Sequence, residues 1–297
     1  MDLQEFLDGL KEKPFVTSSK PQTSFYPSSA SIEWQDPKLG RIVKGECHRQ
    51  TFYKFSSLPK EGVKPANFSR MATLGDYLSD MFVDEFKSAG IYVVHEIPFY
   101  NTDLNVSGRI DAIIRDPSIV KSLLERPIPE EMIGVEFKST GKYHNIKGPL
   151  VSTRDTPLGP KIEHVLQVLT YLDYYGKFGL NKWLLWYIDR ESMNYKIHKI
   201  TINEDGSVHI SNEQRVYDLP HITLNGLRNR FTTIRTLIKN KQLPPRDYQI
   251  QYSNKKLKLL YESDLLNKTE SAAIEKIVKK RPNAFNSNKP LIAKGDV

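Results

Sequence analysis

Residues 161–176 constrain the fold more than any other stretch of the chain. Their sequence, KIEHVLQVLTYLDYYG, places apolar residues at helical spacing and predicts an amphipathic helix with one buried side. That side is expected to hold Ile162, Val165, Leu166, Leu169 and Leu172. A helix with one apolar side must pack against another layer of structure, and the neighbouring segments indicate what that layer is.

Segments with the character of β-strands lie on both sides of this helix. β-Branched and aromatic residues are dense at 91–99, 106–115, 133–138, 182–189 and 195–202. Further helices are predicted at 71–88 and 223–240. Their core sides are expected to hold Leu74, Leu78, Met81, Phe82 and Phe86 in the first and Leu224, Leu227, Phe231, Ile234 and Leu237 in the second. This order predicts an α/β protein with a mixed central β-sheet flanked by helices and with N- and C-terminal extensions.

The extensions differ from the core in composition. Residues 1–50 look irregular, and we expect an N-terminal arm and extension over 1–69, a core over 70–250, and a basic C-terminal helix and tail over 251–297. The chain has a net charge of +8, and residues 255–294 hold ten basic and four acidic side chains, a net +6. This excess favours a polyanionic partner, and a solvated helix and tail would explain it equally well.

The chain shows no segment for a membrane or for export. It has no run of about 18 apolar residues, and its first 15 residues include acidic side chains and no sustained apolar stretch. We therefore expect no membrane partner and a cytoplasmic location, which would be the host cytoplasm if a phage encodes the protein. Cys47 is the single cysteine, so one chain has no cysteine pair for a disulfide and no set of four for an iron–sulfur cluster.

The strand at 133–138 ends in two charged residues that flank an aromatic one. Glu136 and Lys138 point to the same side of the strand, because side chains alternate, and Phe137 points to the other side. Asp111 lies between apolar residues in the strand at 106–115. If these strands pair, the two carboxylates and the backbone carbonyl of Phe137 form an oxygen site for Mg²⁺ or Mn²⁺, next to a lysine. The alternative is an ordinary surface ion pair between neighbouring strands.

The helix at 161–176 carries a second row of side chains, apart from its apolar one. Gln167 and Tyr171 are four residues apart and share a side, which His164 and Tyr174 extend. Amides, phenols and imidazoles contact phosphates and stack on bases, so this row predicts a DNA contact. An ordinary polar side facing water is the alternative.

Asp111, then Glu136-x-Lys138-Ser139, then Gln167-x-x-x-Tyr171, resembles the PD-(D/E)XK nuclease superfamily, and within it the RecB-like exonuclease branch. The resemblance covers roughly residues 70–200, with a weaker match at Ser28-Ser29 and Cys47-His48-Arg49. It implies a restriction-endonuclease-like core over 70–250. It also implies that Asp111 and Glu136 are metal ligands, that Lys138 is the catalytic lysine, and that Gln167 and Tyr171 organise the site and the DNA strand.

Two features depart from the family pattern. Family members commonly carry a histidine on the helix before the first strand, whereas Gly75 here is followed by no histidine, and Asp80 is the candidate to supply an oxygen instead. Many RecB-like relatives hold an iron–sulfur cluster on four cysteines. Cys47 lies where the first would fall and the others are missing, so we expect no iron–sulfur cluster.

The segment from Ser139 to about residue 160 is long for a plain connection and follows the catalytic strand directly. The residues expected to contact the DNA backbone are Ser139, Lys142, Lys147 and Arg154, so neutralising the two lysines should flatten the salt dependence of binding.

The expected function is a Mg²⁺- or Mn²⁺-dependent deoxyribonuclease, in the first place an exonuclease acting on single-stranded DNA or duplex ends in replication, recombination or repair. A structure-specific endonuclease that cuts junctions or flaps, and a degenerate fold that only binds nucleic acid, are the alternatives. No GxxxxGK[ST] motif occurs, so the chain lacks a helicase motor of its own, and a helicase or recombination protein would be its partner. The sequence does not indicate an oligomeric state.

Overall fold

The structure is a computed structural model, and it describes residues 13–17, 21–38, 40–56, 60–64, 66–119, 127–140, 159–213, 215–245 and 254–286. The chain divides into two compact units. The first consists of residues 1–13, 24–45 and 64–231, and the second of residues 14–23, 46–63 and 232–297. Each unit draws on separate stretches of the chain. The sequence-based division at residues 69 and 250 stays a prediction.

The first unit is built on a seven-stranded mixed sheet, which confirms the predicted α/β class. Its strands are β5 (Tyr92–Asn101), β6 (Val106–Arg115), β7 (Met132–Thr140), β8 (Trp183–Asp189), β9 (Tyr195–Ile202), β10 (Ser207–Ser211) and β11 (Val216–Thr223), in the spatial order β11-β10-β9-β8-β7-β6-β5. β7 and β8 run parallel, and the other described neighbours are antiparallel. A parallel pair needs a crossover, and here the crossover contains a helix.

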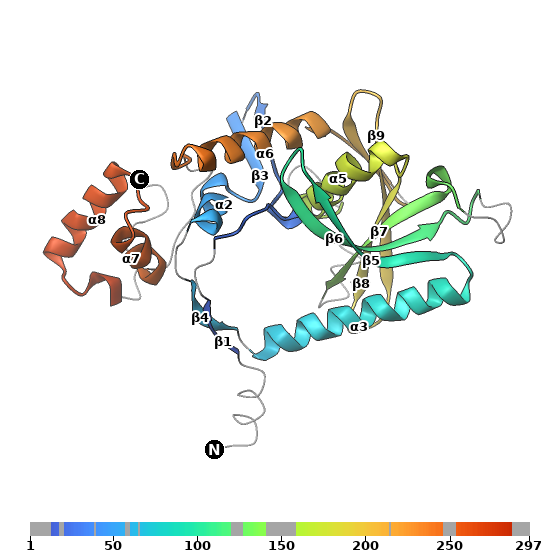
Figure 1. Ribbon diagram of the computed structural model, residues 1–297, viewed down its shortest axis with the longest axis horizontal. Coiled ribbons are helices and arrows are strands. Elements are labelled where there is room, and N and C mark those ends of the chain that lie inside the picture. Colours follow the sequence, from blue (N-terminus) through green and yellow to red (C-terminus); the bar gives the residue numbers. More distant parts are fainter. Residues whose placement is uncertain are drawn as a thin grey trace, which may run out of the picture. The chain divides into compact units, whose positions relative to one another are not determined.

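That crossover helix is α5 (Ile162–Tyr175), and it covers one face of the sheet, while α3 (Ala66–Ser88) covers the other (Figure 1). A third helix, α6 (Leu224–Lys239), follows the last strand. All three helices were predicted within a few residues of their ends. The apolar side of α5 is confirmed, because its five predicted core residues are at most 4% exposed. Short 3₁₀ turns occur at η1 (Pro27–Ser29), η2 (Pro129–Glu131) and η3 (Gly176–Phe178).

The predicted core side of α3 is confirmed in part. Leu78, Phe82 and Phe86 are buried as expected, whereas Leu74 and Met81 are 42% and 36% exposed. Gly75 and Ser79, which were not predicted to face the sheet, are partly buried. A Cβ added to Gly75 would lie 3.4 Å from the Ser139 hydroxyl of β7, and the Ser79 hydroxyl donates to the Gly75 carbonyl. Gly75 and Ser79 are small enough for the helix to lie close to the sheet, but they do not contribute to an apolar pattern in the sequence.

Residues 1–50 were expected to be irregular, and for a large part of them this was wrong. Strands β2 (Ser31–Asp36) and β3 (Gly40–Gly45) form an antiparallel hairpin in the first unit. Phe25 pairs with Val106 of β6 and is 1% exposed, so the segment before the hairpin is packed into the core. The strands are short and contain polar residues and glycine, so they lack the dense β-branched pattern on which the prediction relied.

The second unit is mainly helical. It contains α2 (His48–Phe55), α7 (Asn254–Glu262), α8 (Lys268–Lys280), the turn η4 (Ala284–Asn286), and a two-stranded sheet of β1 (Lys13–Thr17) and β4 (Lys60–Lys64). Arg49 of α2 is buried, and it donates to Glu270 of α8 at 2.5 Å and to the Pro244 carbonyl at 2.8 Å. Cys47, which lies two residues before Arg49 in the sequence, is fully buried. Among the described helices, none combines the length and the apolarity needed to cross a bilayer.

Candidate active site

The site lies where β6 and β7 separate. Their antiparallel register runs from Arg115↔Met132 to Ala112↔Val135, and the next pair along would be Asp111 and Glu136. The backbone pairing ends there, and the Phe137 N–H donates to the Asp111 carboxylate at 2.7 Å instead. Strand β7 continues along β8 as far as Thr140↔Asp189. This fork, the point where β6 and β7 separate, therefore places the carboxylates of Asp111 and Glu136 close together, just past the last backbone pair of the two strands.

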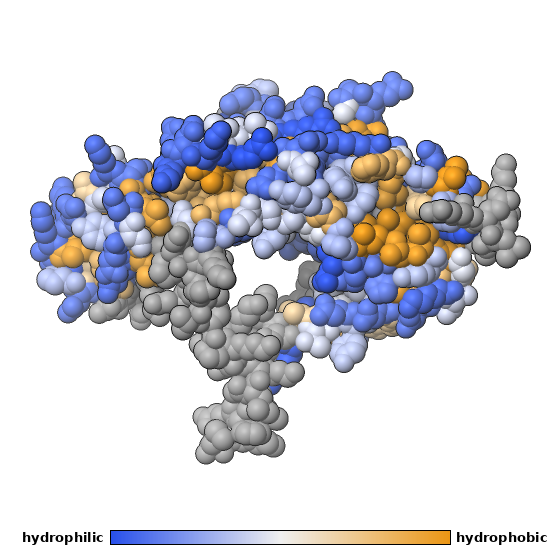
Figure 2. Space-filling model, in the orientation of Figure 1, coloured by the Kyte–Doolittle hydropathy of each residue, from blue (hydrophilic) through white to orange (hydrophobic). Residues whose placement is uncertain are grey.

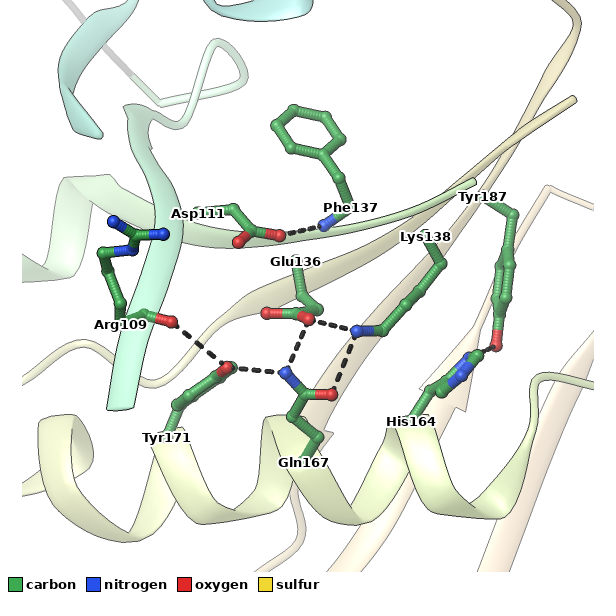
Figure 3. Close-up of polar contacts among 9 residues, drawn as sticks. All are labelled: Arg109, Asp111, Glu136, Phe137, Lys138, His164, Gln167, Tyr171 and Tyr187. Atoms are coloured by element: carbon green, nitrogen blue, oxygen red, sulfur yellow. Dashed lines mark hydrogen bonds and ion pairs between the residues drawn. The ribbon is translucent and has the colours of Figure 1, made fainter. Parts of the chain in front are cut away.

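A hydrogen-bonded network connects this fork to α5 (Figure 3). Lys138 donates to one oxygen of Glu136, Oε1, and to the Gln167 side-chain oxygen at 3.0 Å. The Gln167 amide nitrogen donates to the same Glu136 oxygen at 2.6 Å and to the Tyr171 hydroxyl at 2.8 Å. Tyr171 donates to the Arg109 carbonyl of β6 at 3.5 Å. The network thus reaches from β7 through α5 to β6.

The network is held in place by packing beneath it. Tyr171 is 1% exposed, and its ring stacks on Trp183 of β8 at 4.9 Å between centroids. Trp183 in turn lies against the backbone of Gly134, where an added Cβ would come within 2.5 Å of the indole. A glycine inside a strand often marks such a close approach. Gly134 therefore makes room for Trp183, which positions Tyr171 and, through it, Gln167.

The charges of the fork are only partly compensated. Glu136 is 2% exposed, and its second oxygen, Oε2, is buried without a hydrogen-bond partner among the described residues. Burial, followed by the negative charge of Glu136, raises the pKa of Asp111 to about 8, despite the N–H of Phe137 and the charge of Lys138. Two carboxylates that share a site resist ionising together unless a cation joins them.

This arrangement fits a divalent cation by its donor chemistry. A buried carboxylate oxygen without a partner, next to a second carboxylate with a raised pKa, is the donor set that hard cations such as Mg²⁺ prefer. Among the described residues, no group of three or more His, Cys, Asp and Glu side chains could hold a metal ion. The side-chain donors at the fork are therefore the two carboxylates of Asp111 and Glu136.

Comparison with known proteins adds no family to this picture. No protein-family model matches the chain, no curated protein matches its sequence, and no solved structure matches its fold. The resemblance to PD-(D/E)XK nucleases therefore rests on the motif residues alone and stays a prediction.

Some predicted site residues lie together and others lie elsewhere. The structure brings together Asp111, Glu136, Phe137, Lys138, Gln167 and Tyr171. It does not bring Asp80 to this group. Asp80 is exposed and lines a shallow hollow on the outer side of α3 with Tyr77 and Asp84. Figure 2 shows the visible side of α3 as mostly hydrophilic.

Other predicted DNA contacts are also placed differently. Ser139 is exposed and lies next to Gly75 on the α3 face, which is opposite to the face of Lys138. The ring of Tyr171 is buried against Trp183, so it offers no open face to a base. Lys142, Lys147 and Arg154 lie outside the described residues.

Two arginines of α6, Arg228 and Arg230, are engaged in ion pairs within the first unit. Arg228 pairs with buried Asp173 at 2.5 Å, and Arg230, itself 5% exposed, pairs with Glu33 at 2.5 Å. These contacts tie α6 to α5 and to the β2–β3 hairpin.

Sequence reasoning missed three residues that border the site. Tyr187 of β8 contacts His164, and Arg109, two residues before Asp111, pairs with Glu96 of β5. Glu96 has a positive φ of 55°, which is uncommon for a residue other than glycine. Its charge contributes to raising the pKa of Asp111. Tyr187 and Glu96 carry no signal of their own, because only strand pairing places them beside the motif residues.

Proposed function

We propose that this protein is a metal-dependent deoxyribonuclease, in the first place an exonuclease that acts on DNA ends or single strands. One observation carries the proposal. Glu136 is buried with an unpartnered oxygen beside Asp111, whose pKa is raised, and Lys138 lies within hydrogen-bonding reach of the same glutamate. Buried charge of this kind costs folding stability, so its presence is best explained by function.

Asp111 and Glu136 would hold the cation, Mg²⁺ or Mn²⁺, with the Phe137 carbonyl as a further oxygen. When bound, such a cation would lower the pKa of a coordinated water molecule and neutralise charge on the phosphate. The Phe137 N–H fixes one Asp111 oxygen at 2.7 Å, so the other remains available to a ligand.

Lys138 would position the attacking water and support the charge that develops on the phosphate. In the hydrolysis, a bond forms between the water oxygen and phosphorus. The bond from phosphorus to the leaving oxygen breaks, and a proton passes to that oxygen. Gln167 would hold the side chains of Lys138 and Glu136 in position, because it accepts a hydrogen bond from the lysine and donates one to the carboxylate. Its role is positioning, since it touches the two catalytic side chains.

The experiment compares wild type with Lys138→Ala and Glu136→Gln on end-labelled linear DNA and on closed circular DNA, with Mg²⁺, Mn²⁺ or EDTA. We expect metal-dependent cleavage by wild type and a loss of about 1000-fold or more in both variants, because each removes a group that acts in the transition state. Lys199→Ala is the matched control, since this lysine is exposed on β9, which is two strands away from β7 in the same sheet.

The outcomes separate the competing functions. Degradation of linear DNA alone supports an exonuclease, and cutting of the circle supports an endonuclease. DNA binding by wild type without cleavage in any metal would refute the nuclease and favour a fold that only binds nucleic acid. Cleavage that survives Lys138→Ala would refute the site. A role in replication, recombination or repair, with a helicase or recombination protein as partner, is part of the same proposal.

A further inference from the structure

The edge of the site beyond Lys138 holds a histidine with a fixed partner. His164 is in the first turn of α5, and its Nδ1 lies 2.9 Å from the hydroxyl of Tyr187 on β8. Tyr187 is 2% exposed, and its hydroxyl also accepts the backbone N–H of Lys161 at 3.1 Å. The Tyr187 hydroxyl is therefore held in place by two contacts with the start of α5, one with its backbone and one with a side chain.

These contacts decide where the imidazole carries its proton. The Tyr187 oxygen already accepts from Lys161, so its own hydrogen needs an acceptor, and His164 Nδ1 is the acceptor within reach among the described residues. If Nδ1 carried the hydrogen instead, the buried Tyr187 hydroxyl would have nowhere to donate, which is costly. A neutral imidazole whose Nδ1 accepts must carry its hydrogen on Nε2.

The ring is also held neutral. Burial, followed by the charges of Lys138 and Lys161, lowers the pKa of His164 to about 3. The Nε2–H is therefore an uncharged donor at neutral pH. The described residues offer Nε2 no hydrogen-bond partner, and the side chain is partly exposed, so this donor is left for a ligand. Figure 3 shows His164 on the same helix as Gln167, beyond Lys138.

We infer that His164 is fixed as the Nε2–H tautomer by Tyr187 and donates this N–H to a phosphate oxygen of the bound nucleic-acid strand, next to the phosphate that is cleaved. The inference rests on the proposed function and assigns a strand contact to a residue outside the carboxylate–lysine group. A neutral donor suits a place beside Lys138, because a second cation there would repel the lysine.

The tautomer is tested without any cleavage. Nitrogen-15 NMR of the full chain labelled in histidine, with His164→Gln used to assign the signal, reports which ring nitrogen is protonated. We expect Nε2 to carry the hydrogen and Nδ1 to be the unprotonated acceptor, with no protonation down to pH 5. A hydrogen on Nδ1, or a ring that is charged at pH 6, would overturn the inference.

The phosphate contact is tested by binding of single-stranded DNA in Ca²⁺ at several salt concentrations. We expect His164→Leu to weaken binding about 5- to 10-fold at every salt concentration, because a neutral donor releases no counterion. His164→Gln, whose amide N–H can replace Nε2–H, should stay within about 2-fold of wild type. Lys138→Ala should instead lower the salt slope by about 0.7, and His221→Leu, an exposed residue outside the site, is the control.

Failure of this inference is distinguishable from failure of the nuclease proposal. If wild type binds DNA but does not cleave it, the nuclease proposal fails, whereas the NMR and binding experiments still decide whether His164 contacts the strand as an Nε2–H donor. If wild type cleaves and His164→Leu binds and cleaves as wild type does, the phosphate contact is refuted while the nuclease remains. A changed salt slope in His164→Leu would also refute the neutral donor.

Discussion

The two faces of the central sheet use the same strands for opposite purposes. On the α3 face, Phe82, Phe86, Phe137 and Trp186 form one aromatic cluster with ring centroids 5.0–6.2 Å apart. On the α5 face, one residue along the same strand, Glu136 is buried among polar side chains and keeps an oxygen without a partner.

The difference follows from strand alternation and indicates how the chain distributes stability and function. Apolar burial on the α3 face contributes favourable free energy at every contact. The α5 face carries buried charge, which opposes folding unless a ligand compensates it. A sheet whose α3 face is stabilised by apolar packing can retain such a site on its other face. Three variants test this division, from the largest expected effect to the smallest.

Phe82→Ala tests the stabilising face. Phe82 is 3% exposed and contacts Phe137 and Trp186, so we expect the free energy of unfolding to fall by about 3–5 kcal/mol. Cleavage per folded molecule should fall far less than in Lys138→Ala, because the side chains of Glu136 and Lys138 lie on the opposite face of the sheet. Urea denaturation measures the loss. Leu74→Ala, exposed on the same helix, should cost less than about 0.5 kcal/mol. Equal losses in the two variants would contradict the observed side of α3.

His198 tests the cost of polar burial on the α5 face. It is fully buried beside Tyr187, neither ring nitrogen has a partner among the described residues, and burial lowers its pKa to about 4. The unfolded chain takes up the proton first as the pH falls below about 6.5, so stability is retained above that pH and lost towards pH 4.

The expected loss for His198 is about 3 kcal/mol between pH 6.5 and pH 4, at about 1.4 kcal/mol for each pKa unit. Urea denaturation at a series of pH values measures it, and His198→Phe should remove most of this dependence on acid. His221→Gln is the control, because this histidine is exposed and stacks on Trp34. An identical pH profile in His198→Phe and wild type would show that the ring is not held neutral.

Asp111→Asn tests whether the site lowers stability. Its pKa is raised to about 8, so the ionised carboxylate costs stability as the pH rises from about 3.8, the unfolded value. The amide can still accept from the Phe137 N–H, so we expect the metal-free variant to gain about 1–2 kcal/mol at pH 7.5. Thermal melts in EDTA measure the gain. Mn²⁺ should raise the melting temperature of wild type but not that of Asp111→Asn. A destabilised variant would mean that Asp111 serves the fold.

The sequence indicated five of the seven strands of the central sheet and the three helices α3, α5 and α6, because their patterns are local, whereas β10 and β11 were not predicted. The apolar side of α5 and the alternation in β7 need only the spacing of residues within one element. The same kind of spacing placed Glu136 and Lys138 on one side of β7, and it placed Gln167 and Tyr171 on one side of α5. The β2–β3 hairpin was missed because its short strands carry no dense apolar pattern.

What the sequence determined by itself was therefore most of the elements of the sheet and its helices, the α/β class and the motif residues. Only the tertiary structure decided that β6 and β7 separate at Asp111 and Glu136, that Tyr171 lies inside the protein, and that Asp80 lies apart from the site. It also brought Tyr187 to His164 and made room for Trp183 at Gly134. The physical reason is that periodicity records which side of an element is buried. Partners across strands depend on register and packing between residues far apart in the chain.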